Sequence, residues 1–255
     1  MAKVTLEKIL LGVVKGSIYA MLLSPLLLSA DYFFPAIFPK AVYIRLLVEI
    51  ALVAYIPLAW AVPKYRPQPH IIYLVLAIFA AVVFISSLSG VNFSFSFWGN
   101  YERMDGIFSW LHFWLLLVMA ASVFQEKRDW QKLFSASVAI ALLLAFYGFL
   151  QKWGIGQFGP VKVYDVDAQR ITSTIGNPGF LAVYLLFNCA LAINIIIDKV
   201  RAGVWRWGAA VSLVILFWAF LLTGIRGAWF GMLAGLAVFF VGYFFWIKTK
   251  ARKII

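Results

Sequence analysis

Residues 71–87, IIYLVLAIFAAVVFISS, form an uncharged apolar run that decides the fold class. A helix needs about 17–25 apolar residues to cross a hydrocarbon core of about 30 Å. Lipid offers no hydrogen-bond partners, so the peptide groups of such a run must bond to one another, as they do in a helix. The stretch therefore predicts a membrane-spanning helix at Ile71–Ser87.

Seven further runs of similar length flank this one on both sides, which predicts an all-α, polytopic transmembrane bundle of about eight spans. They are Ile9–Ala30, Ala41–Val62, Ile107–Phe124, Leu133–Leu150, Gly179–Ile197, Gly208–Thr223 and Trp229–Ile247. We expect residues 1–255 to form one transmembrane domain, since no polar stretch is long enough for a soluble one.

The composition excludes an ordinary soluble domain. Hydrophobic residues make up 64% of the chain and charged residues 13%, against about 45–50% and about 25% in soluble domains. The net charge of +12 would favour nucleic acid in a soluble protein, but here the charges lie between apolar runs. We therefore expect a lipid bilayer, and no nucleic acid, as partner. The single cysteine, Cys189, excludes a disulfide within the chain, and we expect neither a metal nor a cofactor.

The cationic residues set the expected orientation. With the N-terminus in the cytoplasm, fourteen Lys and Arg fall in inner segments and six in outer ones, and Lys15 and Arg45 within spans complete the 22. Inner loops are enriched in these residues, so the N-terminus is predicted to be cytoplasmic. The first run follows Lys3 and Lys8 but is too long for the core of a signal peptide, so we expect an uncleaved helix.

Two longer outer segments, Leu88–Gly106 and Gln151–Pro178, are expected to hold the functional site, because function concentrates on loops held by a rigid scaffold. The first contains residues 97–106, FWGNYERMDG. Asp105 is placed to cap the following helix. Arg103 is placed to face a sugar or a lipid headgroup, and the aromatic residues fit either a carbohydrate or the membrane interface.

The second outer segment ends in residues 169–180, QRITSTIGNPGF. Asn177 and Pro178 predict a turn into a helix, and the N–H groups at a helix start attract anions. Arg170 beside that start suits a phosphate. The alternative is a capped turn whose arginine meets lipid headgroups.

A tight outer turn separates the last two spans, in residues 222–229, LTGIRGAW. Arg226 is its only charge, and a guanidinium binds phosphate through two parallel hydrogen bonds. Gly224 and Gly227 leave room for another segment or a ligand. Alternatively, Arg226 is an anchor at the membrane edge. Glycines at 227, 231 and 235 share one helix face, which predicts close helix packing.

Arg45 and Glu49 stand four residues apart inside the second span, and we expect them to neutralise each other on one helix face. His112 lies in the fourth span, close enough to its outer half to be considered as a base. A transporter would need such charges within the membrane.

Three of these segments together resemble the O-antigen ligase and polymerase superfamily of membrane proteins. Residues 99–106 are similar to its G-x-x-x-R-x-x-G motif, 170–178 to its R-x-x-[ST]…G-N-P-N segment, and 223–229 to its T-x-S-R-G-A-W/L segment. Gly179 and Ile225 depart from the Asn and Ser usual there. Family members usually have more spans and a later periplasmic loop with a catalytic histidine or a similar group, so this chain is expected to correspond to their N-terminal part or to be a degenerate member.

The resemblance implies metal-independent glycan transfer from a polyprenyl-diphosphate-linked donor, on the outer face of a bacterial inner membrane. Arg170 and Arg226 would stabilise the diphosphate, while Arg103, Asp105 and Asn177 would bind substrate. The acceptor would be a glycan, a lipid or a protein. Asp165 and Asp167 lie in the right loop for a base, without support from the family. A transporter or flippase of lipid-linked glycans, and a non-enzymatic membrane scaffold, are the alternatives.

Overall fold

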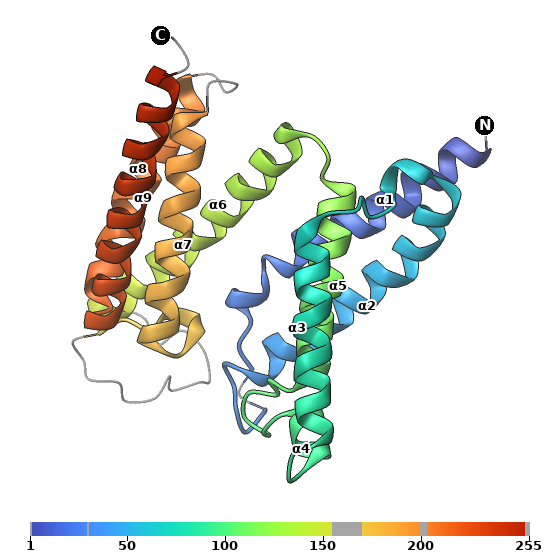
Figure 1. The fold of residues 1–255 in the computed structure, drawn as a ribbon. Coiled ribbons are helices and arrows are strands. Elements are labelled where there is room, and N and C mark those ends of the chain that lie inside the picture. The colour runs from blue at the N-terminus through green and yellow to red at the C-terminus, as the bar shows by residue number, and fades with distance from the viewer. Residues whose placement is uncertain (1, 30, 155–169, 199–202, 253–255) are drawn as a thin grey trace. The chain divides into compact units, whose positions relative to one another are not determined.

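The computed structural model describes residues 2–29, 31–154, 170–198 and 203–252, and this part of the chain is helical and without strands (Figure 1). The α-helices are α1 (Ala2–Met21), α2 (Phe38–Ala61), α3 (Ile71–Leu88), α4 (Phe93–Trp98), α5 (Ile107–Val123), α6 (Lys127–Lys152), α7 (Pro178–Ile197), α8 (Gly203–Leu222) and α9 (Arg226–Arg252). Short 3₁₀ turns are η1 (Ser24–Leu26), η2 (Pro63–Tyr65) and η3 (Ser173–Ile175). The predicted all-α class is confirmed.

Seven stretches of the described chain are long and apolar enough to cross a membrane. They are Thr5–Leu26, Phe38–Ala61, Ile71–Leu88, Lys127–Lys152, Pro178–Ile197, Gly203–Leu222 and Arg226–Phe245. The remaining expected span is the apolar helix α5, whose 17 residues give a length of about 26 Å. The chain is a multi-pass membrane protein.

The helices fall into two compact units, which divide within α6 between Ile140 and Ala141. In the first unit, α1 and α2 pack through side chains that are entirely inaccessible, among them Val14, Val48 and Leu58. Met119 of α5 joins the same core. Small and branched apolar side chains therefore fill the contacts between these helices. Such packing is expected in a membrane, because lipid tails are as apolar as the side chains and the hydrophobic effect does not drive helices together.

Polar contacts in the first unit fix the directions of its helices. Glu7, near the start of α1, meets Lys64, just after α2, at 2.8 Å, so these two helices are antiparallel. Gln125, just after α5, donates to the Lys64 carbonyl at 2.5 Å, so α2 and α5 end together. Segments predicted to lie on the cytoplasmic side thus meet at one end of this unit, as alternate crossing requires.

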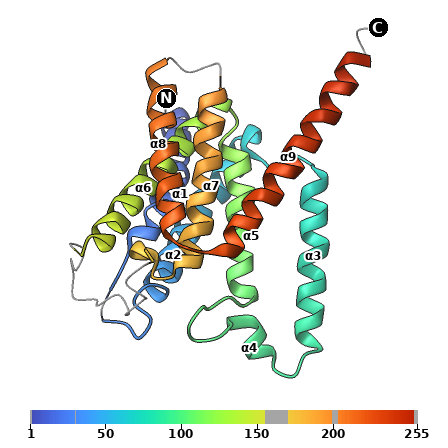
Figure 2. The same cartoon turned by 90° about the vertical axis from the view of Figure 1, so that its left-hand side faces the viewer.

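In the second unit, α7 and α8 pack tightly, with Leu181, Leu185 and Leu216 fully buried. Figure 2 shows α9 diverging from α8 beyond their shared turn. A Cβ atom on Gly227, Gly231 or Gly235 would meet nothing within 4 Å in the described chain. Within the second unit these glycines therefore pack against no other described helix, and close packing at this face of α9 stays a prediction.

Candidate functional site

The two arginine-bearing motifs of the second unit lie against each other. The Ile171 N–H donates to the Leu222 carbonyl at 3.3 Å. The Arg170 side chain crosses Gly224, where an added Cβ would lie 3.3 Å from Arg170 Nε. Gly224 also has φ +64°, a left-handed conformation that favours glycine. The room expected beside Gly224 is thus filled by Arg170, which brings this side chain onto the turn that carries Arg226.

A side chain from α6 holds the segment after Arg170. The Gln151 amide oxygen accepts from the Thr172 N–H at 3.2 Å and the Ser173 N–H at 2.7 Å. Its amide nitrogen donates to Thr172 Oγ1 at 3.3 Å. Ser173 Oγ donates to the Leu144 carbonyl at 2.8 Å. The sequence around Gln151 carries no signal for this role, because its partners are more than twenty residues away in a loop of irregular backbone.

Close packing between α6 and the same segment adds to these hydrogen bonds. Ile171 is 1% exposed, and an added Cβ on Gly148 would approach its Cδ1 to 2.9 Å. Only a glycine lets the α6 backbone meet this side chain at that distance. The start of the Arg170 segment is therefore anchored by both a polar clamp and an apolar contact.

Asn177 begins α7, as its position before a proline predicts. Gly176 has φ +79°, and the Asn177 amide oxygen then accepts from the Gly179 N–H at 2.8 Å and the Phe180 N–H at 3.2 Å. This is an N-cap, with Pro178 in the first turn. The oxygen of Asn177 is thus occupied by its own helix, and the NH₂ group is what it offers a ligand.

Arg170 and Arg226 are both exposed, and Arg226 is the first residue of α9. Ion pairs within the described chain join Lys15 to Asp129, Lys64 to Glu7 and His112 to Glu49, and include neither arginine. The two guanidinium groups and the adjacent helix starts therefore form a cationic surface at this end of the second unit. Asp165 and Asp167 lie outside the described residues.

The first unit holds the other predicted site residues, in the loop between α4 and α5. Asn100 Oδ1 accepts from the Arg103 N–H at 2.6 Å and forms a tight turn. The side chains of Arg103 and Asp105 are exposed.

The prediction that the Asp105 side chain caps the following helix, α5, is wrong. Gly106 is the N-cap residue of α5, and no side chain caps this helix. An added Cβ on Gly106 would collide with the Phe97 carbonyl and with Gly99 N. The backbones of residues 97–99 and 104–106 thus approach each other so closely that a glycine takes the cap position. The Asp105 side chain is available for other contacts.

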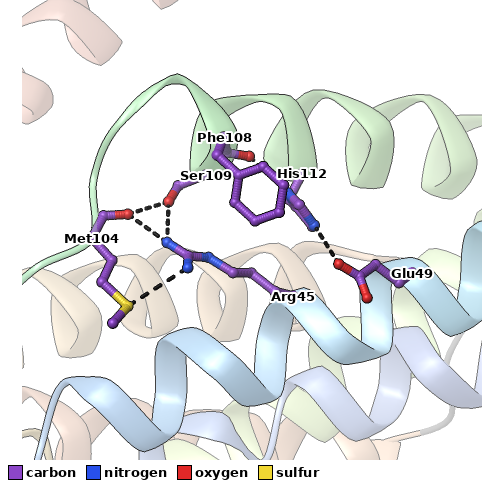
Figure 3. A network of polar contacts seen from close by, with 6 residues as sticks. All are labelled: Arg45, Glu49, Met104, Phe108, Ser109 and His112. Atoms are coloured by element: carbon purple, nitrogen blue, oxygen red, sulfur yellow. Dashed lines mark hydrogen bonds and ion pairs between the residues drawn. The ribbon is translucent and has the colours of Figure 1, made fainter. Parts of the chain in front are cut away.

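Arg45 supports this loop from α2 (Figure 3). Its Nη2 donates to the Met104 carbonyl and to Ser109 Oγ, both at 2.6 Å, and its guanidinium lies 5.3 Å from the Phe108 ring centre. Met104 has φ +53°, which is uncommon for a residue with a side chain. Arg45 therefore helps to hold a strained backbone position next to Arg103.

The expected ion pair between Arg45 and Glu49 is absent from the ion pairs of the described residues. Glu49 instead meets His112 of α5 at 3.3 Å (Figure 3). The four-residue spacing brings the two side chains to one side of α2, but Arg45 binds the Met104 carbonyl and Ser109, whereas Glu49 meets His112.

Among the described residues, no three His, Cys, Asp or Glu side chains gather where they could share a metal ion. Compared with protein-family models, curated proteins and solved structures, the chain has no significant match. Membership of the O-antigen ligase superfamily thus rests on the three sequence motifs and stays a prediction.

Proposed function

We propose that this chain takes part in glycan transfer from a polyprenyl-diphosphate-linked donor, at the outer face of a bacterial inner membrane. One observation supports the proposal above all others: the Arg170 side chain lies over the turn that carries Arg226. Two motifs about fifty residues apart in sequence thus contribute one exposed guanidinium each to the same end of the second unit.

The chemistry of that surface suits a diphosphate. As the bond between the sugar and the diphosphate breaks, negative charge grows on the leaving phosphate. Cations that are already in place stabilise this charge without reorganising. A guanidinium keeps its proton and binds phosphate oxygens in pairs, so Arg170 and Arg226 would serve in binding and in the reaction. The Asn177 NH₂ group is a further donor.

The remaining partners follow from the same proposal. The polyprenyl tail would lie in the bilayer beside the apolar helices, and Arg103 and Asp105 would bind the glycan or the acceptor. The acceptor hydroxyl, whether on a glycan, a lipid or a protein, must lose a proton to a general base. A longer protein of the proposed family would supply that base from its later loop.

A transfer assay in membranes, with polyprenyl-diphosphate-linked glycan as donor and cell-envelope extract as acceptor, tests the proposal. We expect Arg170→Ala and Arg226→Ala each to lower transfer about a hundredfold, the usual loss when one charge-stabilising donor is removed. Arg128→Ala is the matched control, because Arg128 is also an exposed arginine but lies in the first unit, at the start of α6. Transfer should survive a chelator.

Donor binding measured in the same membranes separates the alternatives. Donor bound through Arg170 and Arg226 but not transferred would indicate a carrier or flippase of lipid-linked glycans, or an incomplete enzyme. Neither binding nor transfer, or equal losses in Arg128→Ala, would refute the proposed diphosphate site.

A further inference from the structure

Glu49 and His112 form an ionisable pair within the membrane-spanning part of the first unit. Glu49 is the twelfth of the 24 residues of α2, about 17 Å from its start. His112 is the sixth residue of α5, about 8 Å from its start. Ionisable side chains within membrane spans are costly, and they mark functional positions such as proton relays more often than elsewhere in a protein.

The hydrogen bonds of His112 determine where its protons are. Nδ1 lies 2.7 Å from the Phe108 carbonyl oxygen, which accepts hydrogen bonds and cannot donate. Nδ1 therefore carries a hydrogen. Nε2 lies 3.3 Å from Glu49 Oε1. If the carboxylate is ionised, Nε2 must also carry a hydrogen for this contact to be favourable; if Nε2 is bare, the carboxyl group must carry it.

We propose that Glu49 and His112 are an intramembrane proton-binding site, which holds one proton between Oε1 and Nε2. The proton either stays on the carboxyl group or moves to the imidazole, leaving a carboxylate and an imidazolium. The pair has no net charge in either form, so holding the proton avoids an isolated charge within the membrane. This inference is independent of glycan transfer.

The two side chains differ in access. The His112 side chain is 7% exposed and the Glu49 side chain 56% exposed. The Phe108 ring packs on the imidazole with centroids 4.5 Å apart. Glu49 is therefore the exposed partner of the pair, and His112 is the buried one.

Several charged groups of the first unit have hydrogen-bond or ion-pair partners elsewhere. Arg45 binds the Met104 carbonyl and Ser109 (Figure 3). On α1, which packs on both α2 and α5, Lys15 pairs with Asp129, and Glu7 pairs with Lys64 of η2. The other neighbours, α3, α4 and η1, contain no Asp, Glu, Lys, Arg or His. Arg45 also interacts electrostatically with Glu49, one helical turn away on α2, although the two form no ion pair.

The test is to observe the proton directly in the full chain, reconstituted in lipid bilayers. The chain has two histidines, so His70→Asn leaves His112 as the only imidazole. Asparagine preserves the α3 cap, where His70 Nδ1 accepts from the Ile72 N–H. Nitrogen-15 NMR of labelled histidine then reports both ring nitrogens at neutral pH. Infrared spectra of carbon-13-labelled glutamate report any protonated carboxyl group.

We expect Nδ1 to be protonated, together with one of two signatures: a protonated Nε2, or a carboxylic-acid band that disappears in Glu49→Gln. Glu49→Gln should also convert any imidazolium to the neutral Nδ1–H form, since a side-chain amide can donate to Nε2. His112→Gln provides a second variant that removes the same proton site. An unprotonated Nδ1, or a neutral imidazole beside an ionised Glu49, would overturn the proposal.

Discussion

Replacing Gln151 by alanine tests how the Arg170 segment is held. The Thr172 and Ser173 N–H groups both donate to the Gln151 amide oxygen, and these residues are 2% and 0% exposed. Water cannot easily replace the lost acceptor. A buried donor left without a partner costs about 1–3 kcal/mol; because the two donors share one acceptor, we take about 1–2 kcal/mol for each and expect Gln151→Ala to weaken this segment by about 2–4 kcal/mol in total.

Hydrogen exchange of the two amides in detergent or bilayers is the direct assay. Since each 1.4 kcal/mol is a factor of ten in the equilibrium constant for local opening, hydrogen exchange at Thr172 and Ser173 should become about 30- to 700-fold faster. Gln151→Glu keeps the acceptor oxygens and loses the donation to Thr172 Oγ1, so it should cost only about 1 kcal/mol. Gln68→Ala, at an exposed glutamine with a single long hydrogen bond of 3.5 Å, is the control and should change nothing at these amides. Unchanged exchange at Thr172 and Ser173 in Gln151→Ala would refute the clamp.

Three further tests by substitution address other parts of the two units. Gly224→Ala and Gly154→Ala both place a side chain at positive φ, which costs about 1–2 kcal/mol each, but only the added methyl group at position 224 meets Arg170. The midpoint temperature of thermal unfolding should therefore fall equally in both variants, whereas donor affinity should fall about fivefold more in Gly224→Ala. Equal losses of donor affinity would contradict the contact between Gly224 and Arg170. Asn177→Ala should lower the free energy of unfolding by about 1 kcal/mol in denaturant titrations, whereas Asn177→Asp should keep it unchanged. An unchanged free energy of unfolding in Asn177→Ala would show that the cap is unimportant. Arg45→Gln should weaken the Met104 turn by about 1.5–3 kcal/mol, seen as faster hydrogen exchange from Met104 onward, and unaltered exchange there would argue against support from α2.

Features set by local sequence were predictable. The long apolar runs gave the helices, because the length of a run and the absence of charge determine whether it can span lipid. Asn177 and Pro178 gave the start of α7, because an N-cap and a first-turn proline act on their own helix. The short turn around Gly224 was likewise expected from the small gap between the last two apolar runs, and Gly224 has positive φ there.

Features set by contacts between distant segments were not predictable. Glu49 has a favourable charge four residues away in Arg45, yet it meets His112, 63 residues along the chain. Gln151 carries no motif, and its importance appears only when the loop backbone turns toward α6. Asp105 is a good cap by residue type, but the close approach of two backbones requires glycine at the cap position. Spacing along one helix does not contain this information.

Helix α3 has a consequence for the surrounding membrane. None of the residues in its membrane-length window is buried within the described part of the first unit, so much of its apolar surface is left to lipid. Its 18 residues are about 27 Å long, whereas the hydrocarbon core is about 30 Å thick. No Lys or Arg lies within three residues of either end of α3, so no long cationic side chain extends from the helix end to the lipid headgroups. A helix of this length is best matched to a hydrocarbon core of about 27 Å, and in a thicker bilayer the mismatch costs a fraction of a kcal/mol per Å.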